Sequence, residues 1–154
     1  MPINTLTEYL DKHSIEYITI RHSRAFTAQT IAASAHIPGK KMAKSVIIKM
    51  DGKMAMAVLP ASYRIDIHQL KIATGCDKLE LSHEYEFKNK FPDCELGAMP
   101  PFGNIYGMPV YVAKSLAEDE EIAFNACSHS LLIKMKYEDF DKLVKPKILK
   151  FSAK

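Results

Sequence analysis

Residues 44–59 read KSVIIKM-DG-KMAMAVL, two largely apolar runs separated by Asp51-Gly52. An Asp-Gly pair between two such runs is a strong signal for a two-residue β-hairpin, because glycine readily supplies the positive φ that the turn needs. We therefore expect antiparallel strands over residues 44–50 and 53–59. A hairpin of this kind argues against a doubly wound, purely parallel sheet.

The segments on either side of the hairpin alternate between helical and strand-like patterns. Upstream we expect a helix over about residues 5–13, with a Thr5–Glu8 capping box, then a strand over 17–21 and a helix over 29–36 capped by Thr27. Downstream we expect a helix over 67–74 between Asp66 and Gly75, a strand over 79–81, a helix over 83–90, strands over 110–112, 122–125 and 131–136, and a helix over 137–144. This order predicts a mixed α/β fold.

Length and composition indicate an ordinary globular protein. The chain has 154 residues, of which 47% are hydrophobic and 25% charged, so we expect a single domain over 1–154 with a basic tail over about 145–154. The longest purely apolar run, residues 54–59, is far too short to cross a membrane, and the N-terminus lacks a signal-peptide pattern. Three widely spaced cysteines do not suggest a disulfide framework, which favours a reducing, cytoplasmic setting. Cys76 and Cys94 are interpreted as small apolar fillers.

The charge is unevenly distributed along the chain. The formal net charge is +3, but residues 21–71 carry +7, residues 77–121 carry −6 and residues 122–154 carry +4. Such asymmetry suggests a polyanionic partner for the basic segments. The alternative is that the lysines only keep a small protein soluble.

The segment 97–109, GAMPPFGNIYGMP, is the sharpest local feature. Three glycines and three prolines in thirteen residues exclude a regular helix or a central strand. A stiff loop with free N–H groups is able to hydrogen-bond a carbonyl or a developing oxyanion. The alternative is a rigid turn between two strands. The loop lacks the GxxxxGK[ST] pattern of a phosphate-binding P-loop.

Three further side chains are candidates for a site. Lys44 opens a strand after a basic pair and is able to hold a phosphate, although most lysines are simply solvated. His129 lies in a small polar break, CSHS, where it could orient a substrate or serve only the structure. His22 ends a predicted strand and could line a pocket or lie on the surface. Cys127 near His129 does not make a metal site, because paired ligand spacing is absent, and we expect no cofactor.

Five landmarks occur together in one order along the chain. They are RHSRAFTA (21–28), Ala43-Lys44-Ser45, VLPAS (58–62), GAMPPFG (97–103) and the break that contains His129. In this combination, and over about residues 5–144, the chain resembles the YbaK/prolyl-tRNA synthetase-associated domain family of aminoacyl-tRNA editing domains. The Gly-x-x-x-Pro pattern from Gly97 to Pro101 together with Lys44 is the most specific element.

The resemblance implies a bent, mixed, largely antiparallel sheet flanked by helices, and a deacylase that cleaves a wrong amino acid from the 3′ end of tRNA. It assigns Gly97 to the aminoacyl carbonyl, with Ala98 beside it, and Lys44 to the phosphate of the terminal nucleotide. It also implies a substrate pocket shaped by these residues: His22, Ser45, Met99, Pro100, Pro101, Phe102, Gly103 and His129. Hydrolysis would use the substrate's own 2′-hydroxyl to activate water, with no metal and no enzyme nucleophile.

The family resemblance limits the expected substrate to one class of aminoacyl ester. Esters of Ala, Cys, Ser or Thr are the expected substrates, and Ser45 stands where some subgroups have Asn, so no subgroup's specificity is transferred. We expect a free-standing, trans-acting enzyme that binds the acceptor end of aminoacyl-tRNA, with a synthetase as a possible partner, no membrane association and an open oligomeric state. The alternative function is a non-catalytic tRNA-binding module that docks on a synthetase or the ribosome.

Overall fold

The computed structural model describes residues 2–21, 41–92, 94–95 and 97–153. Its α-helices are α1 (Pro2–Lys12), α3 (Ile67–Thr74), α4 (Glu84–Phe87), α5 (Lys114–Ala117) and α6 (Tyr137–Val144), and two short 3-10 helices are η1 (Lys88–Lys90) and η2 (Gly103–Tyr106). Its strands are β1 (Tyr17–Arg21), β2 (Ala43–Met50), β3 (Lys53–Pro60), β4 (Arg64–Ile65), β5 (Leu79–Leu81), β6 (Val110–Ala113), β7 (Glu121–Ser128), β8 (Leu131–Lys136), β9 (Lys147–Leu149) and β10 (Ser152–Ala153).

The hairpin expected from residues 44–59 is confirmed. β2 and β3 pair antiparallel along their full length, and the turn residues Asp51 and Gly52 have φ values of 52° and 84°. The Asp51 carboxylate also accepts hydrogen bonds from the backbone N–H groups of Asp77 (3.0 Å) and Lys78 (2.8 Å). The turn is therefore tied to the segment that leads into β5.

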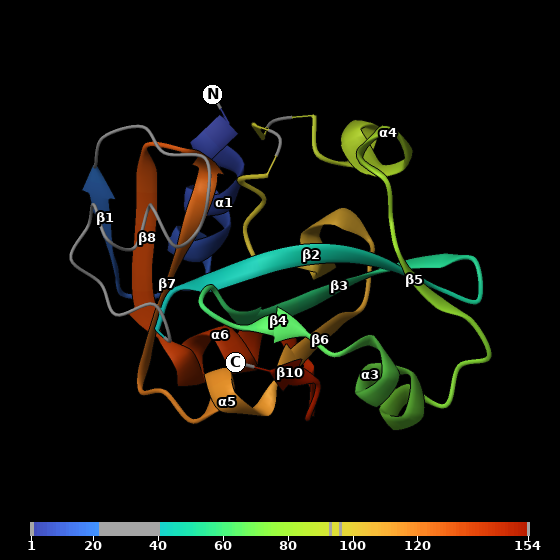
Figure 1. The fold of residues 1–154 in the computed structure, drawn as a ribbon. Coiled ribbons are helices and arrows are strands. Elements are labelled where there is room, and N and C mark those ends of the chain that lie inside the picture. The colour runs from blue at the N-terminus through green and yellow to red at the C-terminus, as the bar shows by residue number, and fades with distance from the viewer. Residues whose placement is uncertain (1, 22–40, 93, 96, 154) are drawn as a thin grey trace.

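The hairpin forms the centre of an open, mixed sheet (Figure 1). The strand order is β5-β2-β3-β6-β9, in which β5, β2 and β3 are antiparallel and β3, β6 and β9 are parallel. A second, antiparallel sheet has the order β1-β8-β7, and β10 pairs with β4. The mixed α/β fold with largely antiparallel pairing predicted from the sequence is confirmed.

The two larger sheets meet at the start of β2. Met42 forms a parallel bridge with Ala123 of β7, and the Ala123 N–H donates to the Lys41 carbonyl at 3.1 Å. The sheets diverge from this seam, with α1 packed against β7 (Figure 1).

Strand alternation divides the core between the two faces of the hairpin. Ala43 and Ile47 of β2 belong to the larger apolar cluster, which also holds Phe102, Phe124 and Phe140. Neighbouring positions point to the other face, where Ile48 and Leu59 pack with Leu70 and Phe151 in a smaller cluster. Burying large side chains contributes roughly 1.5–3 kcal/mol each, so the two clusters fix the register of the hairpin.

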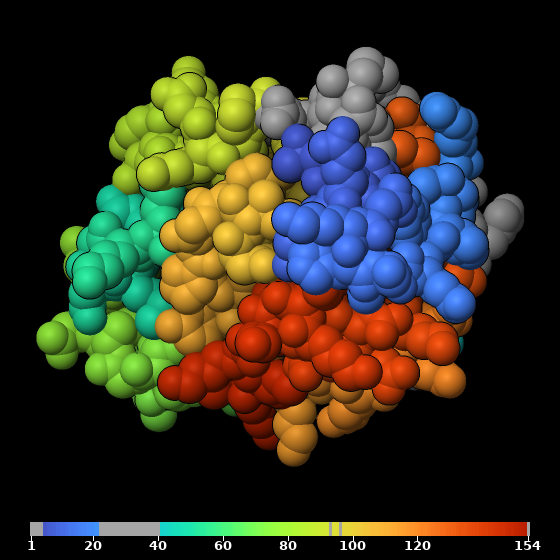
Figure 2. All heavy atoms as spheres, turned by 180° about the vertical axis from the view of Figure 1, so that it is seen from behind, coloured from blue at the N-terminus to red at the C-terminus, as the bar shows by residue number. Residues whose placement is uncertain are grey.

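The back of the molecule joins segments that are distant in sequence. In Figure 2, α1, residues 97–109 (the Gly97 loop) and α6 lie side by side. The Asn104 amide donates to the Tyr9 hydroxyl at 3.1 Å, and the Tyr9 and Phe102 rings lie 6.0 Å apart. The loop is thus held from behind by the N-terminal helix.

Some element boundaries differ from the sequence-based expectations. α1 begins at Pro2, so Thr5 lies inside the helix and not at its cap, because proline is favoured in the first turn. The expected helix over 83–90 is split into α4 and η1, and the predicted helix over 29–36 lies outside the described residues. Asp66 and Gly75 do bound α3: Asp66 accepts from the Gln69 N–H at 3.0 Å, and Gly75 has φ 71°.

The basic C-terminal segment is an integral part of the fold. β9 extends the five-stranded sheet and β10 pairs with β4, so the segment does not behave as a free tail. Phe151 between these strands is fully buried, and its carbonyl accepts from the Asp66 N–H at 2.6 Å. In the described ranges, none of the helices is long and apolar enough to cross a membrane.

The cysteines correct two expectations. A disulfide joins Cys94 to Cys127, and Cys76 is free. The interpretation of Cys94 as an apolar filler is therefore wrong, and so is the expectation that the cysteines form no disulfide. The two partners are 33 residues apart, and only the approach of the Gly97 loop to the end of β7 brings them together, which spacing along the chain does not reveal.

Candidate functional site

The end of β7 is distorted. The register between β7 and β8 shifts between Asn125 and Ser128, and Cys127 has a positive φ of 65°. A bulge of this kind re-aims the side chains that follow it and is common beside functional sites. The Ser128 hydroxyl lies 3.0 Å from that of Ser130 and accepts from the Ser130 N–H at 3.2 Å, which closes a tight turn around His129.

The Gly97 loop is docked on this distorted strand end. The Cys127 N–H donates to the Ala98 carbonyl and the Glu95 N–H donates to the Cys127 carbonyl, each at 3.0 Å. The Ala98 N–H donates back to the Glu95 carbonyl, also at 3.0 Å. Ala98 is fully buried with both backbone groups hydrogen-bonded. It therefore anchors the loop, and its N–H is already engaged within the protein.

The docking brings Gly97 against His129. Gly97 is exposed and has φ 85°, a conformation that L side chains rarely adopt. A Cβ at this position would lie 3.4 Å from Cε1 of His129 and 3.8 Å from Nε2. His129 is only 5% exposed, and its backbone N–H donates to the Glu95 carboxylate at 3.3 Å. Two residues predicted for the site are thus in contact.

The rest of the loop is mostly interior. Met99, Pro100 and Pro101 are buried, and so is Gly103, where a Cβ would lie 2.8 Å from Val110 Cγ2. Phe102 is fully buried, with its ring 5.5 Å from Phe124 and 5.4 Å from Phe140. Phe102 and Gly103 were expected in the substrate pocket, but these positions make them supports of the loop from the core.

Lys44 lies at the start of β2, close to the seam between the sheets. Ala43 and Ile47 point into the larger cluster, so Lys44 points to the opposite face. Partial burial lowers the pKa of its amino group below that of an ordinary lysine. Within the described residues, no hydrogen bond or ion pair joins the Lys44 side chain to Gly97, His129 or any carboxylate.

Two polar side chains near the seam have buried oxygens without partners. Ser45 Oγ, on the face of β2 opposite to Lys44, and Asn125 Oδ1 make no hydrogen bond in the part of the chain that the structure describes. Asn125 is 7% exposed and lies between Phe124 and Ala126, which face the larger cluster. Asn125 therefore points away from that cluster, as Lys44 does. A buried unsatisfied polar group requires an explanation, and a bound ligand is one.

Asn125 was missed by sequence reasoning. It stands in AFNAC, an otherwise apolar strand, and a polar residue in such a strand is the only signal that the sequence offers. The position of Asn125 relative to β2 depends on the bridge between Met42 and Ala123. No local sequence pattern predicts that bridge.

A pocket of about 260 Å³ borders the loop on the α4 side. Its lining residues are Phe87, Lys88, Phe91, Cys94, Glu95 and Met99. The wall is largely apolar, with one basic and one acidic side chain. No cluster of three potential metal ligands occurs among the residues that the structure describes, and His22 lies outside them.

Comparisons with known proteins agree on the fold. No curated protein matches the chain. The solved structure of "hypothetical protein APE2540" matches with a TM-score of 0.85 and 15% identity over 96% of this chain and 99% of the other. A structure described as "a putative trans-editing enzyme for prolyl tRNA synthetase" matches with a TM-score of 0.83 and 14% identity over 99% and 98% of the two chains. At these identities the likeness establishes the fold alone.

The family is established by a direct match of sequence. Residues 22–143 match the model of the aminoacyl-tRNA editing domain. This range contains the β2–β3 hairpin, the Gly97 loop and the distorted end of β7. The chain therefore belongs to the aminoacyl-tRNA editing domain family.

Proposed function

We propose that this protein is a trans-acting deacylase that hydrolyses the ester between a mischarged amino acid and the 3′-terminal adenosine of tRNA. Water attacks the ester carbonyl, the bond from that carbon to the ribose oxygen breaks, and the ribose oxygen takes up a proton. The products are the free amino acid and uncharged tRNA. Membership of the editing-domain family supports this reaction class. On that ground the cytoplasm is the proposed compartment, although a disulfide such as Cys94–Cys127 is unusual there.

The observation that carries the proposal is the placement of Gly97. It is exposed and lacks a side chain, so a planar ester carbonyl is able to approach the loop backbone closely, with His129 beside it. Ala98 and Cys127 hold the loop rigid from behind. A backbone N–H group held in place by such a rigid loop stabilises a developing oxyanion without reorganisation. In other enzymes one such donor typically lowers the activation free energy by roughly 3–4 kcal/mol.

Lys44 supplies the charge that positions the substrate. A desolvated amino group with no ion-pair partner among the described residues gains more from an anion than a solvated one does. The phosphate of the terminal nucleotide is the anion we assign to it. Lys44 thereby orients the ester and takes no part in proton transfer.

Water activation is assigned to the substrate. The 2′-hydroxyl of the terminal ribose is adjacent to the ester and is able to orient or deprotonate the attacking water. His129 lies beside Gly97 and is proposed to line the substrate site. Esters of Ala, Cys, Ser or Thr, the class that the family resemblance implies, are the proposed substrates.

A tRNA-binding module without catalysis is the second candidate. The net charges of +7 over residues 21–71 and +4 over 122–154 favour this module as much as they favour the deacylase. The two candidates differ in a paired measurement on one tRNA. Binding is measured with the uncharged tRNA, and release of labelled amino acid is measured with the same tRNA mischarged. Release well above spontaneous hydrolysis supports the deacylase, and binding with an intact ester supports the module.

The assignment of the 2′-hydroxyl has its own test. A tRNA that ends in 2′-deoxyadenosine, charged on the 3′-oxygen, should bind normally but lose hydrolysis by at least a hundred-fold. Equal rates with both tRNAs would show that a protein group activates the water.

A further inference from the structure

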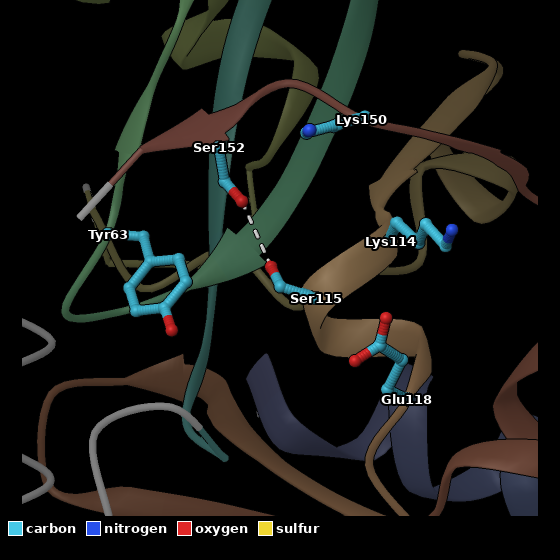
Figure 3. A pocket seen from close by; sticks show the side chains of 6 residues that line it. All are labelled: Tyr63, Lys114, Ser115, Glu118, Lys150 and Ser152. Carbon is cyan, nitrogen blue, oxygen red and sulfur yellow. Dashed lines mark hydrogen bonds between the residues drawn. The ribbon is translucent and has the colours of Figure 1, made fainter.

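A second pocket, of about 370 Å³, lies where the C-terminal segment crosses α5. Its lining residues are Tyr63, Lys114, Ser115, Glu118, Lys150 and Ser152 (Figure 3). None of them belongs to the site built around Gly97, His129 and Lys44. The pocket is therefore a separate feature of the molecule.

The walls of this pocket offer hydrogen-bond donors and positive charge. Ser115 and Ser152 point toward one another from opposite walls, with their hydroxyl oxygens 2.9 Å apart (Figure 3). One hydroxyl donates to the other, so one O–H remains available to a ligand. In the described part of the chain, Lys114 and Lys150 have no carboxylate within ion-pair distance, although Glu118 also lines the pocket.

The register of the sheet places this pocket on the Lys44 side of the molecule. Lys44 on β2 pairs with Leu59 on β3. Because Val58 pairs with Val112, Leu59 lies beside Ala113 on β6. Ala113 in turn pairs with Leu149 on β9. Leu59, Ala113 and Leu149 all pack in the smaller cluster, on the face to which Lys44 points. Lys114 and Lys150 follow Ala113 and Leu149 directly.

Three strand spacings, about 14 Å, therefore separate Lys44 from the strand that leads to Lys150. This is within the reach of a nucleic-acid strand whose end is held at Lys44. Lysine is a compact point charge suited to phosphate, and serine hydroxyls commonly donate to phosphate oxygens.

We propose that this second pocket binds the phosphodiester backbone of the tRNA acceptor arm, so that Lys114, Lys150 and the serine pair hold the strand whose 3′ end is presented to Gly97. The identity of the RNA rests on the proposed function. The contact is to phosphate and is independent of base sequence. The folded C-terminal segment thus acts as part of the tRNA-binding surface.

The test is equilibrium binding of an uncharged tRNA transcript as a function of salt concentration. The variant Lys114→Ala/Lys150→Ala should bind on the order of ten-fold more weakly at physiological salt, and the slope of log K against log salt should fall by about 1 per lysine. The matched control, Lys53→Ala/Lys78→Ala, removes two exposed lysines at the far end of the hairpin and should bind as wild type.

Two further measurements separate this inference from the proposed activity. Glu118→Gln should strengthen tRNA binding, and the lysine double variant should hydrolyse a short aminoacylated CCA trinucleotide at the wild-type rate. Wild-type affinity and salt slope in the double variant would overturn the inference, whether or not the protein is a deacylase. Weakened binding in a protein that cleaves no ester would support the inference and remove the deacylase.

Discussion

Gly97 lies directly against the imidazole of His129, and a Cβ at position 97 would come within 3.4 Å of Cε1. The contact joins a loop of Gly and Pro residues to a strand end distorted by a bulge. A Cβ at position 97 would therefore pack in van der Waals contact with His129, and the positive φ of 85° is what favours glycine there.

Gly97→Ala should abolish most of the hydrolysis while leaving the protein folded. The φ of 85° costs an L residue about 1–2 kcal/mol, and the new methyl group enters the space beside His129. We expect kcat/KM for mischarged tRNA to fall at least ten-fold. A thermal melt of the same sample checks that the variant is folded.

Gly107→Ala is the matched control for this variant. Gly107 has φ 75°, but a Cβ there meets nothing within 4 Å. It should lose similar stability and keep full activity. Equal activity losses in the two variants would mean that the contact with His129 is irrelevant.

Lys44→Ala should raise KM for tRNA more than it lowers kcat, because the lost charge binds a remote phosphate. The control is Lys49→Ala on the same strand, which breaks an ion pair of 2.6 Å with Glu86 on the opposite face. Lys49→Ala should leave tRNA kinetics unchanged. A loss confined to kcat in Lys44→Ala would assign this lysine to the chemistry itself.

The lowered pKa of Lys44 gives a pH dependence with a defined sign. Burial disfavours the ammonium, so tRNA affinity should fall as pH rises through a value below 10.5, and Lys44→Arg should remove that fall. The unfolded chain binds the proton more tightly, so the free energy of unfolding should rise with pH in the same window. An affinity that falls identically in wild type and Lys44→Arg would contradict this assignment.

Asn125→Leu should separate function from stability. The buried Oδ1 has no partner among the described residues, and leaving such a group unsatisfied costs about 1–3 kcal/mol. The substitution should therefore preserve or increase the melting temperature while it lowers the hydrolysis rate. Unchanged hydrolysis in a stabilised protein would remove Asn125 from the site.

The disulfide can be counted directly. In the oxidised native protein only Cys76 should react with a thiol-alkylating reagent, and three thiols should react after reduction and denaturation. Intact mass spectrometry distinguishes one label from three. Three labels without reductant would show that Cys94 and Cys127 are not joined.

The fold was largely predictable because its signals are local. The Asp51-Gly52 turn, the Asp66 and Gly75 boundaries of α3 and the strand over 17–21 each depend on residues close together in sequence. Long-range pairings were not predictable. The parallel pairing of β9 with β6 at the edge of the sheet and the burial of Phe151 depend on the complete sheet.

For the candidate site, the sequence suggested residues but not how they are arranged. Family resemblance pointed to Gly97 and His129, and the structure places them in contact. It gave no warning that Phe102 would be fully buried among other rings, or that Asn125 would have a buried oxygen with no hydrogen-bond partner among the described residues. These features depend on which part of the fold packs against each face of a strand. A sequence pattern shows which residues share a face, but not what that face packs against.

The most direct measurement is release of labelled amino acid from a panel of aminoacyl-tRNAs. The panel carries Ala, Cys, Ser, Thr and Pro, each on proline tRNA and on its cognate tRNA, with Lys44→Ala as the control. We predict rapid deacylation of at least one mischarged species, strongly reduced in the control. Esters that stay intact across the whole panel, on tRNAs that the protein binds, would contradict the assignment as a deacylase.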